Sequence, residues 1–240
     1  GTSEWQYWVL GEEEVIIHIK AFYDVGINTF DAADIYSNGL SDVILGNAIK
    51  KLSLPRDEIV VMTKVYRVVG RTPSEDVGSC GFVALSDLTQ QIAYFRIHQE
   101  RLQLDYVDAV VFVPTRCSIK DRSDSHSVMF LILMQLQSRQ CKVTPYPYLW
   151  HYAITNPLTT FISMQNHHNL VYREEEREIF PTLEMFGVGC VAWSMAQDIA
   201  TAPIVGTTSL KHLQDLLGMC LVSKEQTSEL SLIKVPSVSL

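Results

Sequence analysis

The sequence predicts an α/β fold, and more specifically a TIM-type (β/α)8 barrel, from three observations. Short apolar runs typical of strands alternate with helical stripes along most of the 240 residues. Polar residues able to do chemistry, such as Asp31 and Lys64, stand where two of the runs end, which is the edge where barrels carry their sites. The run Tyr106 to Val113 is almost continuously apolar and β-branched, as in strands buried on both faces.

The expected elements can be given in chain order. We expect helices over Glu12–Val25, Ser41–Leu52, Ala84–Leu102, Glu174–Met185 and Leu210–Cys220, and strands over Ile27–Phe30, Glu58–Thr63, Tyr106–Val113, Phe161–Met164, Gly189–Trp193 and Pro203–Gly206. Gly26 ends the first helical stripe, and Ser41 is the expected N-cap of the second helix. The turn residues Pro55 and Asp57 introduce the strand that delivers Lys64 at its end.

The segment Ser118 to Thr160 gives the weakest pattern. Val128 to Gln137 is apolar enough to be a buried helix. Pro145, Pro147 and Pro157 break up any regular element after it, so no strand is assigned there.

Composition limits the classes of function. The chain is 47% hydrophobic, so it can bury a sizeable core as one domain over residues 1–240. Its net charge of −8 argues against nucleic acid and anionic membrane surfaces as partners. The five cysteines are widely spaced and odd in number, which favours free thiols in a reducing compartment. No signal peptide is visible and no apolar run is long enough to span a bilayer, so we expect a cytoplasmic protein.

Several blocks of sequence, in their order along the chain, resemble the aldo-keto reductases. The blocks are Gly26 to Tyr36, Arg101 to Asp108, Met164 to Leu170 with Arg173 to Glu176, and Ala202 to Ser209. The nearest resemblance within that family is to the fungal aryl-alcohol-dehydrogenase-like branch. It implies an NADP-dependent oxidoreductase domain that reduces a small aldehyde or ketone to an alcohol.

The resemblance also implies catalytic roles for Asp31, Tyr36 and Lys64. Tyr36 would be the general acid that protonates the developing alkoxide. The ammonium of Lys64 beside it would stabilise the phenolate, and Asp31 would keep Lys64 charged and aimed. As isolated residues, an aspartate and a tyrosine in a loop are more often a turn residue and a packed aromatic.

The implied cofactor-binding residues lie later in the chain. They are Gln165, Trp193, Ser194, Gly206, Thr207 and Thr208. Gln165 would bind the nicotinamide carboxamide, Trp193 would stack on the nicotinamide, and the others would lie near phosphates. The choice of NADP over NAD follows from the family alone, since Lys211 is the nearest basic residue for a 2′-phosphate.

Position 113 departs from the family pattern. Val113 stands where the family carries a histidine that donates a hydrogen bond to the substrate carbonyl. Valine can neither donate nor titrate, and losing one oriented donor costs about 10²–10³ in rate. His98, His126 and His151 are not at the matching strand end.

Other departures affect the barrel itself. The chain begins at about the first helix, so we expect the first strand to be missing and the barrel to be incomplete. After Trp193 and Ser194 the chain runs almost directly to Ala202, as if a cofactor-covering loop and a helix were absent. The strand that would supply a Ser-Asn pair is unrecognisable around Val143 to Trp150. A closed barrel would need a substitute strand or a partner chain.

Three hypotheses therefore stay open. The chain is an active reductase, a catalytically inactive pseudoenzyme that binds cofactor or regulates a partner, as potassium-channel β-subunits do, or a degenerate gene product. Carbonyl reduction gained in Val113→His would separate the first two, and cooperative unfolding would separate both from the third. No metal site is expected, because His167 and His168 are adjacent on a strand and point to opposite faces.

Overall fold

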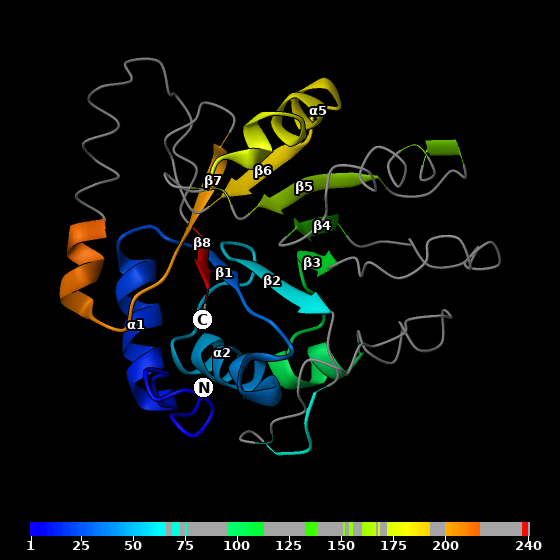
Figure 1. The fold of residues 1–240 in the computed structure, drawn as a ribbon. Helices are drawn as coiled ribbons and strands as arrows, with labels where there is room; N and C mark the ends of the chain where they lie inside the picture. The colour runs from blue at the N-terminus through cyan, green and yellow to red at the C-terminus, as the bar shows by residue number, and fades with distance from the viewer. Residues whose placement is uncertain are drawn as a thin grey trace.

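The computed structural model describes residues 1–65, 69–72, 75, 96–112, 133–138, 151, 154–155, 160–166, 168, 172–192, 200–216 and 237–239. Within these residues, eight parallel strands form a closed barrel in chain order, β1 to β8 (Figure 1). The strands are β1 Thr29–Asp31, β2 Val60–Val65, β3 Ala109–Phe112, β4 Leu133–Ser138, β5 Phe161–Asn166, β6 Gly189–Ala192, β7 Ala200–Val205 and β8 Ser237–Ser239. The predicted fold class, an α/β TIM-type barrel, is confirmed.

The barrel closes through β8, which lies between β7 and β1 (Figure 1). Ser237 pairs with Thr29 on one side and with Ile204 on the other. Where we expected an incomplete sheet, the structure has a closed one, and β8 is the substitute strand that closure from this chain requires. Because β8 pairs on both sides, β1 and β7 have no open edge along these residues.

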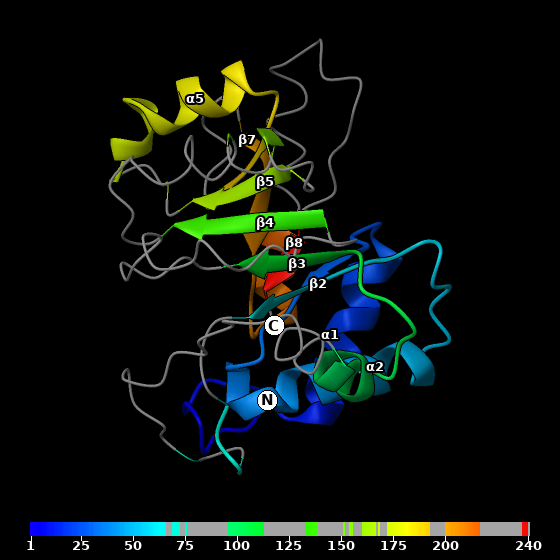
Figure 2. The same ribbon diagram turned by 90° about the vertical axis from the view of Figure 1, so that its right-hand side faces the viewer.

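The helices lie outside the strands, as Figures 1 and 2 show for α1 and α2 beside β1 and β2. They are α1 Glu12–Asp24, the 3-10 helix η1 Tyr36–Gly39, α2 Leu40–Lys51, the 3-10 helix η3 Glu174–Glu176 and α5 Ile179–Met185, with further helical residues at 96–102 and 210–216. Gly26, with a φ of 89°, follows the C-cap of α1 as predicted.

The expected helix over Val128 to Gln137 is wrong, because Leu133–Ser138 forms β4. From Met134 onward, apolar and polar residues alternate with the period of a strand (Met-Gln-Leu-Gln-Ser), and pairing with β3 and β5 fixes that conformation. Residues 84–95 of the expected helix before β3 lie outside the described residues.

Two helix boundaries also differ from the prediction. Ser41 is not an N-cap, since α2 already begins at Leu40 with Gly39 as its N-cap. The Gly39 φ of 88° lets the chain turn directly from η1 into α2 without a capping side chain. The single helix expected over Glu174 to Met185 is divided into η3 and α5, because Glu178 has a φ of −138°.

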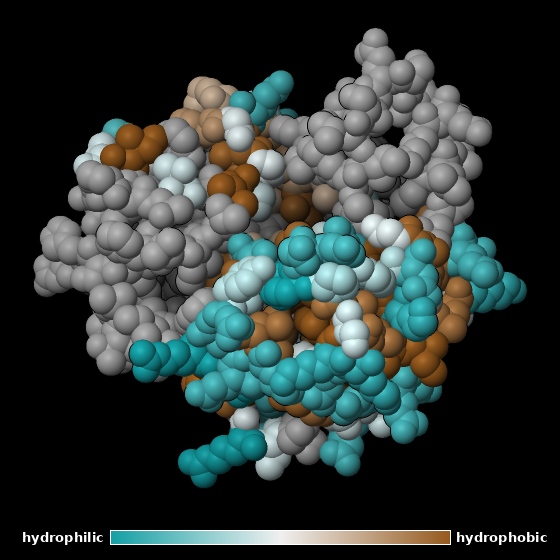
Figure 3. Space-filling model, turned by 180° about the vertical axis from the view of Figure 1, so that it is seen from behind, coloured by the Kyte–Doolittle hydropathy of each residue, from teal (hydrophilic) through white to brown (hydrophobic). Residues whose placement is uncertain are grey.

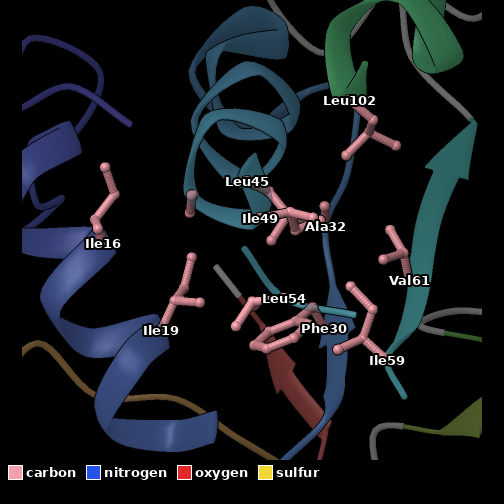
Figure 4. Close-up of a cluster of buried hydrophobic side chains, with 11 residues drawn as sticks. Ile16, Ile19, Phe30, Ala32, Leu45, Ile49, Leu54, Ile59, Val61 and Leu102 are labelled. Atoms are coloured by element: carbon pink, nitrogen blue, oxygen red, sulfur yellow. The ribbon is translucent and has the colours of Figure 1, made fainter. Parts of the chain in front are cut away.

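A hydrophobic core fills the space between α1, α2 and the outer faces of β1 and β2 (Figure 4). Its buried members are Ile16, Ile19, Phe30, Ala32, Leu45, Ala48, Ile49, Leu54, Ile59, Val61 and Leu102. Gly46 lets α2 approach the helical residues 96–102 closely, because a Cβ there would lie 2.3 Å from the carbonyl oxygen of Leu102. This packing holds β1 and β2 rigidly against the helices, and so fixes the loops at their carboxyl ends.

The surface of the described residues is mixed in character. In the view from behind, hydrophilic side chains cover most of the central face, with apolar patches between them (Figure 3). No helix among the described residues is long and apolar enough to cross a membrane.

Candidate active site

A buried ion pair lies inside the barrel at the carboxyl end of β1 and β2. Lys64 Nζ donates to Asp31 Oδ2 and, at 3.2 Å, to the carbonyl oxygen of Ala32. The Asp31 side chain is fully buried and that of Lys64 is 6% exposed. Since Phe30 and Val61 pack on the outer face, alternation along each strand places Asp31 and Lys64 on the inner face. The charges are therefore held in a low-dielectric interior, where the pair interacts strongly.

Tyr36 joins this pair from the loop after β1. Lys64 Nζ lies 5.6 Å from the centroid of the Tyr36 ring, within the range of a cation–π contact. The backbone brings the residues together, because the amide of Ala32 donates to the Met62 carbonyl and that of Asp34 to the Lys64 carbonyl. The structure thus gathers the three residues Asp31, Tyr36 and Lys64, as the sequence predicted for adjacent strand ends.

Gln165 reaches the same carboxylate from the opposite side of the barrel. It lies on β5, and its Nε2 donates to Asp31 Oδ2 at 3.2 Å. The other amide atom, Gln165 Oε1, is buried and has no hydrogen-bond partner among the residues that the structure describes. An unpaired buried acceptor is costly unless a ligand supplies a donor. A primary amide such as the carboxamide of nicotinamide fits this acceptor, so the residues present fit the implied cofactor.

The chain after β5 is fixed by a charged cluster outside the barrel. His168 Nε2 donates to Glu176 Oε1 at 2.8 Å, and Arg173 donates to the same carboxylate at 2.6 and 2.9 Å. The Arg173 guanidinium and, to a smaller extent, His168 lower the pKa of Glu176 to about 2. The His168 ring packs against Phe180, at 4.9 Å between centroids. These contacts join His168 to η3 and α5.

A buried cysteine lies next to this cluster. Cys190 on β6 donates weakly to Asn166 Oδ1 at 3.7 Å. Burial, and then the negative charge of Glu175, raise the pKa of the Cys190 thiol to about 12. A thiol that stays protonated is a poor nucleophile and metal ligand. Among the described residues, no three His, Cys, Asp or Glu side chains converge on a metal position.

His98 does not replace a histidine inside the barrel. Its Nδ1 lies 2.8 Å from Asp42 Oδ2 and 3.2 Å from Thr63 Oγ1. Thr63 precedes Lys64 on β2, so its side chain points to the outer, helix-covered face. His98 is thus committed to a buried contact between α2 and β2, and His151 is exposed. Val113 and His126 lie outside the described residues.

The expected phosphate-binding residues follow β7. Gly206 and Thr208 are exposed, and Thr207 Oγ1 accepts from the amide of Ser209 at 3.0 Å just before the helical residues 210–216. Parallel strands end at one edge, so this turn lies at the same end of the barrel as Gln165. Amides at such a strand-to-helix turn favour anions. Trp193 and Ser194 lie outside the described residues.

Comparison with known proteins agrees with this arrangement. The sequence pattern of the Aldo/keto reductase family matches residues 1–198. The chain belongs to the aldo/keto reductase family. The resemblance to this family noted from the motifs is therefore confirmed.

Two curated relatives of this aldo/keto reductase are fungal. It is 35% identical to the aldo-keto reductase dtxS3 of Metarhizium robertsii over 80% of this chain and 57% of that protein. It is 32% identical to a Schizosaccharomyces pombe protein named as an aryl-alcohol dehydrogenase, over 83% of this chain and 67% of that one. The chain thus spans little more than half the length of the Metarhizium relative.

A solved structure supports the fold. The aldo/keto reductase from Klebsiella pneumoniae, solved in complex with NADP and acetate, superposes with a TM-score of 0.56. The match covers 76% of this chain and 58% of that chain, at 16% identity. At that identity the likeness shows a shared barrel and no more.

The sequence did not reveal two features of the site. One is the hydrogen bond between Gln165 and Asp31, which joins residues 134 positions apart. The other is Asn38, whose side chain binds the segment after β2. An Asn-Gly pair is a strong turn signal, so Asn38-Gly39 could have drawn attention to that loop.

Proposed function

We propose that this aldo/keto reductase catalyses NADP(H)-linked reduction of a small aldehyde or ketone to an alcohol. The observation that carries the proposal is the buried Lys64–Asp31 pair with its ammonium at the ring of Tyr36. Burying two charges costs free energy unless they are held in good geometry, and this pair lies at the carboxyl end of the barrel, where sites of this fold are found. The proposal treats residues 1–240 as one domain and the protein as cytoplasmic.

The chemistry follows from the roles of these side chains. When bound, a nicotinamide cofactor would be the source of the hydride for the carbonyl carbon. The Tyr36 hydroxyl donates its proton to the carbonyl oxygen, which becomes the alcohol. The Lys64 ammonium stabilises the phenolate left behind until solvent returns the proton. Asp31 accepts a hydrogen bond from Lys64 and fixes the direction of that side chain, and Gln165 donates to the same carboxylate.

Two places at the carboxyl end of the barrel would bind the cofactor, Gln165 on β5 and the turn that follows β7. Gln165 Oε1 would accept from the nicotinamide carboxamide. Gly206, Thr207 and Thr208 would bind phosphate oxygens through backbone amides and hydroxyl groups. In the same proposal Trp193 stacks on the nicotinamide and Ser194 lies near a phosphate. The choice of NADP rests on membership of the aldo/keto reductase family.

A second candidate function rests on Val113. Without a donor at that position, the carbonyl loses one of its two orienting contacts. The chain would then bind NADPH without turnover and act as a regulatory subunit. The two candidates agree on cofactor binding and differ only in whether carbonyl reduction follows it.

The experiment is to measure NADPH consumption with a panel of small aryl and alkyl aldehydes and ketones. We expect turnover by the wild-type chain, a loss of about 10²–10⁴-fold in Tyr36→Phe, and a gain in Val113→His. Tyr106→Phe is the matched control, because Tyr106 is 46% exposed and stacks against Arg56. Saturable NADPH binding without consumption in either wild type or Val113→His would favour the regulatory subunit instead.

A further inference from the structure

The backbone immediately after Tyr36 has an unusual conformation. Ser37 and Asn38 have φ values of 49° and 51°, and Gly39 follows with 88°. Only glycine enters this left-handed region freely, and asparagine tolerates it better than most other residues. Both Ser37 and Asn38 are buried. A buried strained conformation beside a candidate catalytic residue persists only where neighbouring contacts hold it.

The side chain of Asn38 supplies such contacts. Its Nδ2 donates to the carbonyl oxygens of Thr72 at 2.8 Å and Glu75 at 2.7 Å. Its Oδ1 accepts from the Gly70 amide at 2.9 Å. The packing is close, since a Cβ at Gly70 would lie 2.7 Å from Asn38 Nδ2. The amide therefore uses both donors and its acceptor on the segment that follows β2, the strand that carries Lys64.

The neighbours of Asn38 hold the same turn from other directions. Ser37 Oγ accepts from the backbone amide of Thr2 at 3.1 Å. A Cβ at Gly39 would lie 2.5 Å from the guanidinium of Arg101, so the backbone there is packed tightly against that side chain. The turn that carries Tyr36 is thus fixed from three separate segments.

We propose that Asn38 is a positioning residue for the reaction, because its amide ties the backbone after Tyr36 to the segment after Lys64. The inference rests on the proposed function. The phenol comes from η1 and the ammonium from β2, and the hydrogen bonds of Asn38 hold η1 against the segment that follows β2. Asparagine suits the position because it combines tolerance of a positive φ with two donors and an acceptor on one short side chain.

Two variants separate the conformation from the hydrogen bonds. Asn38→Gly keeps the backbone conformation accessible and removes all three hydrogen bonds. Asn38→Asp keeps the shape and the acceptor, but at neutral pH it places a carboxylate against two carbonyl oxygens. Gln103→Gly is the control, because Gln103 also has a positive φ of 56° and bonds through its side chain to Lys50 and Asn47.

We expect kcat to fall by about 10²-fold in Asn38→Gly, as for a misplacement of about 1 Å at a reacting group. The NADPH Kd should stay within about twofold of wild type, because the cofactor contacts lie on other strands. In Asn38→Asp, activity should recover as the pH is lowered, since a protonated carboxyl can donate one of the lost hydrogen bonds. Gln103→Gly should leave kcat unchanged.

A kcat in Asn38→Gly equal to that of wild type would overturn the inference, as would equal losses of kcat and NADPH affinity. If the wild-type chain reduces no carbonyl compound, the proposed function fails separately. In that case, amide hydrogen exchange still tests whether Asn38 holds the segment that follows β2. Faster exchange at Gly70 in Asn38→Gly, without faster exchange across the barrel strands, supports it, and unchanged exchange at Gly70 overturns it.

Discussion

Replacing Lys64 by methionine tests the buried ion pair at the centre of the proposed site. The substitution keeps the length and apolar stem of the side chain and removes the ammonium. Asp31 is fully buried, and after the change it would retain one charge-stabilising donor, Gln165 Nε2 at 3.2 Å. Removing one partner of a buried pair costs about 3–5 kcal/mol, because the remaining charge is left uncompensated. We expect the free energy of unfolding to fall by that amount at pH 7.

The loss of stability should depend on whether Asp31 keeps its charge. The double variant Asp31→Asn/Lys64→Met should recover most of the stability, because no buried charge remains. The difference between the double variant and the sum of the singles gives the coupling energy of the pair.

Urea-induced unfolding followed by far-UV circular dichroism measures these free energies. The matched control is Lys20→Met, which breaks an exposed pair with Asp24, in which the two side chains are 59% and 54% exposed. Exposed pairs contribute about 0–1 kcal/mol. If Lys64→Met cost no more than Lys20→Met, the ion pair would not be buried and the geometry proposed for Tyr36 would lose its basis.

Three further predictions concern the surroundings of the site. Glu176→Gln should destabilise the fold at pH 7 because it removes the negative charge and one of the two oxygens that accept from Arg173. The pKa of Glu176 is about 2 in the folded chain and has an ordinary value of 4.5, so the stability that its charge contributes is present above pH 4.5 and is lost as the pH falls toward 2. In urea titrations, the difference in unfolding free energy between wild type and Glu176→Gln should therefore disappear over that range. A difference that stays constant down to pH 2 would contradict the lowered pKa. Gly46→Ala should cost about 1–3 kcal/mol by overpacking against Leu102, and a neutral result in the same assay would show that the helices can separate. Cys190, with its pKa raised to about 12, should resist alkylation at pH 8 until the chain unfolds, as peptide mass mapping would show; rapid labelling of the native chain would be inconsistent with its burial.

The local pattern of the sequence predicted the barrel, and the resemblance to the aldo-keto reductases supplied the candidate catalytic residues. Asp31 ends β1 and Lys64 is the next-to-last residue of β2, and parallel strands bring their carboxyl ends to one edge. Tyr36 follows Asp31 closely enough to stay in the same loop. No long-range information was needed to bring these three residues together.

The strands β4 and β8 and the hydrogen bond across the barrel depend on contacts between residues far apart in the sequence, so they could not be predicted from local pattern. Ser237–Ser239 has only one apolar residue, and it becomes β8 because β1 and β7 offer it pairing on both sides. Leu133–Ser138 lies in a run rich in leucine and methionine, which suits a helix equally well until β3 and β5 pair with it. The hydrogen bond from Gln165 to Asp31 crosses the barrel, so it depends on the barrel being closed and on its width.

We propose that the carboxyl end of this barrel binds a nicotinamide cofactor beside Tyr36 and Lys64. The most direct test is a titration of the wild-type chain and of Gln165→Leu with NADPH, following tryptophan emission and the fluorescence of the cofactor. We predict saturable quenching at micromolar NADPH in the wild type and clearly weaker binding in Gln165→Leu, because the buried acceptor for the carboxamide is lost. Absence of saturable binding by a wild-type chain that unfolds cooperatively would contradict the account.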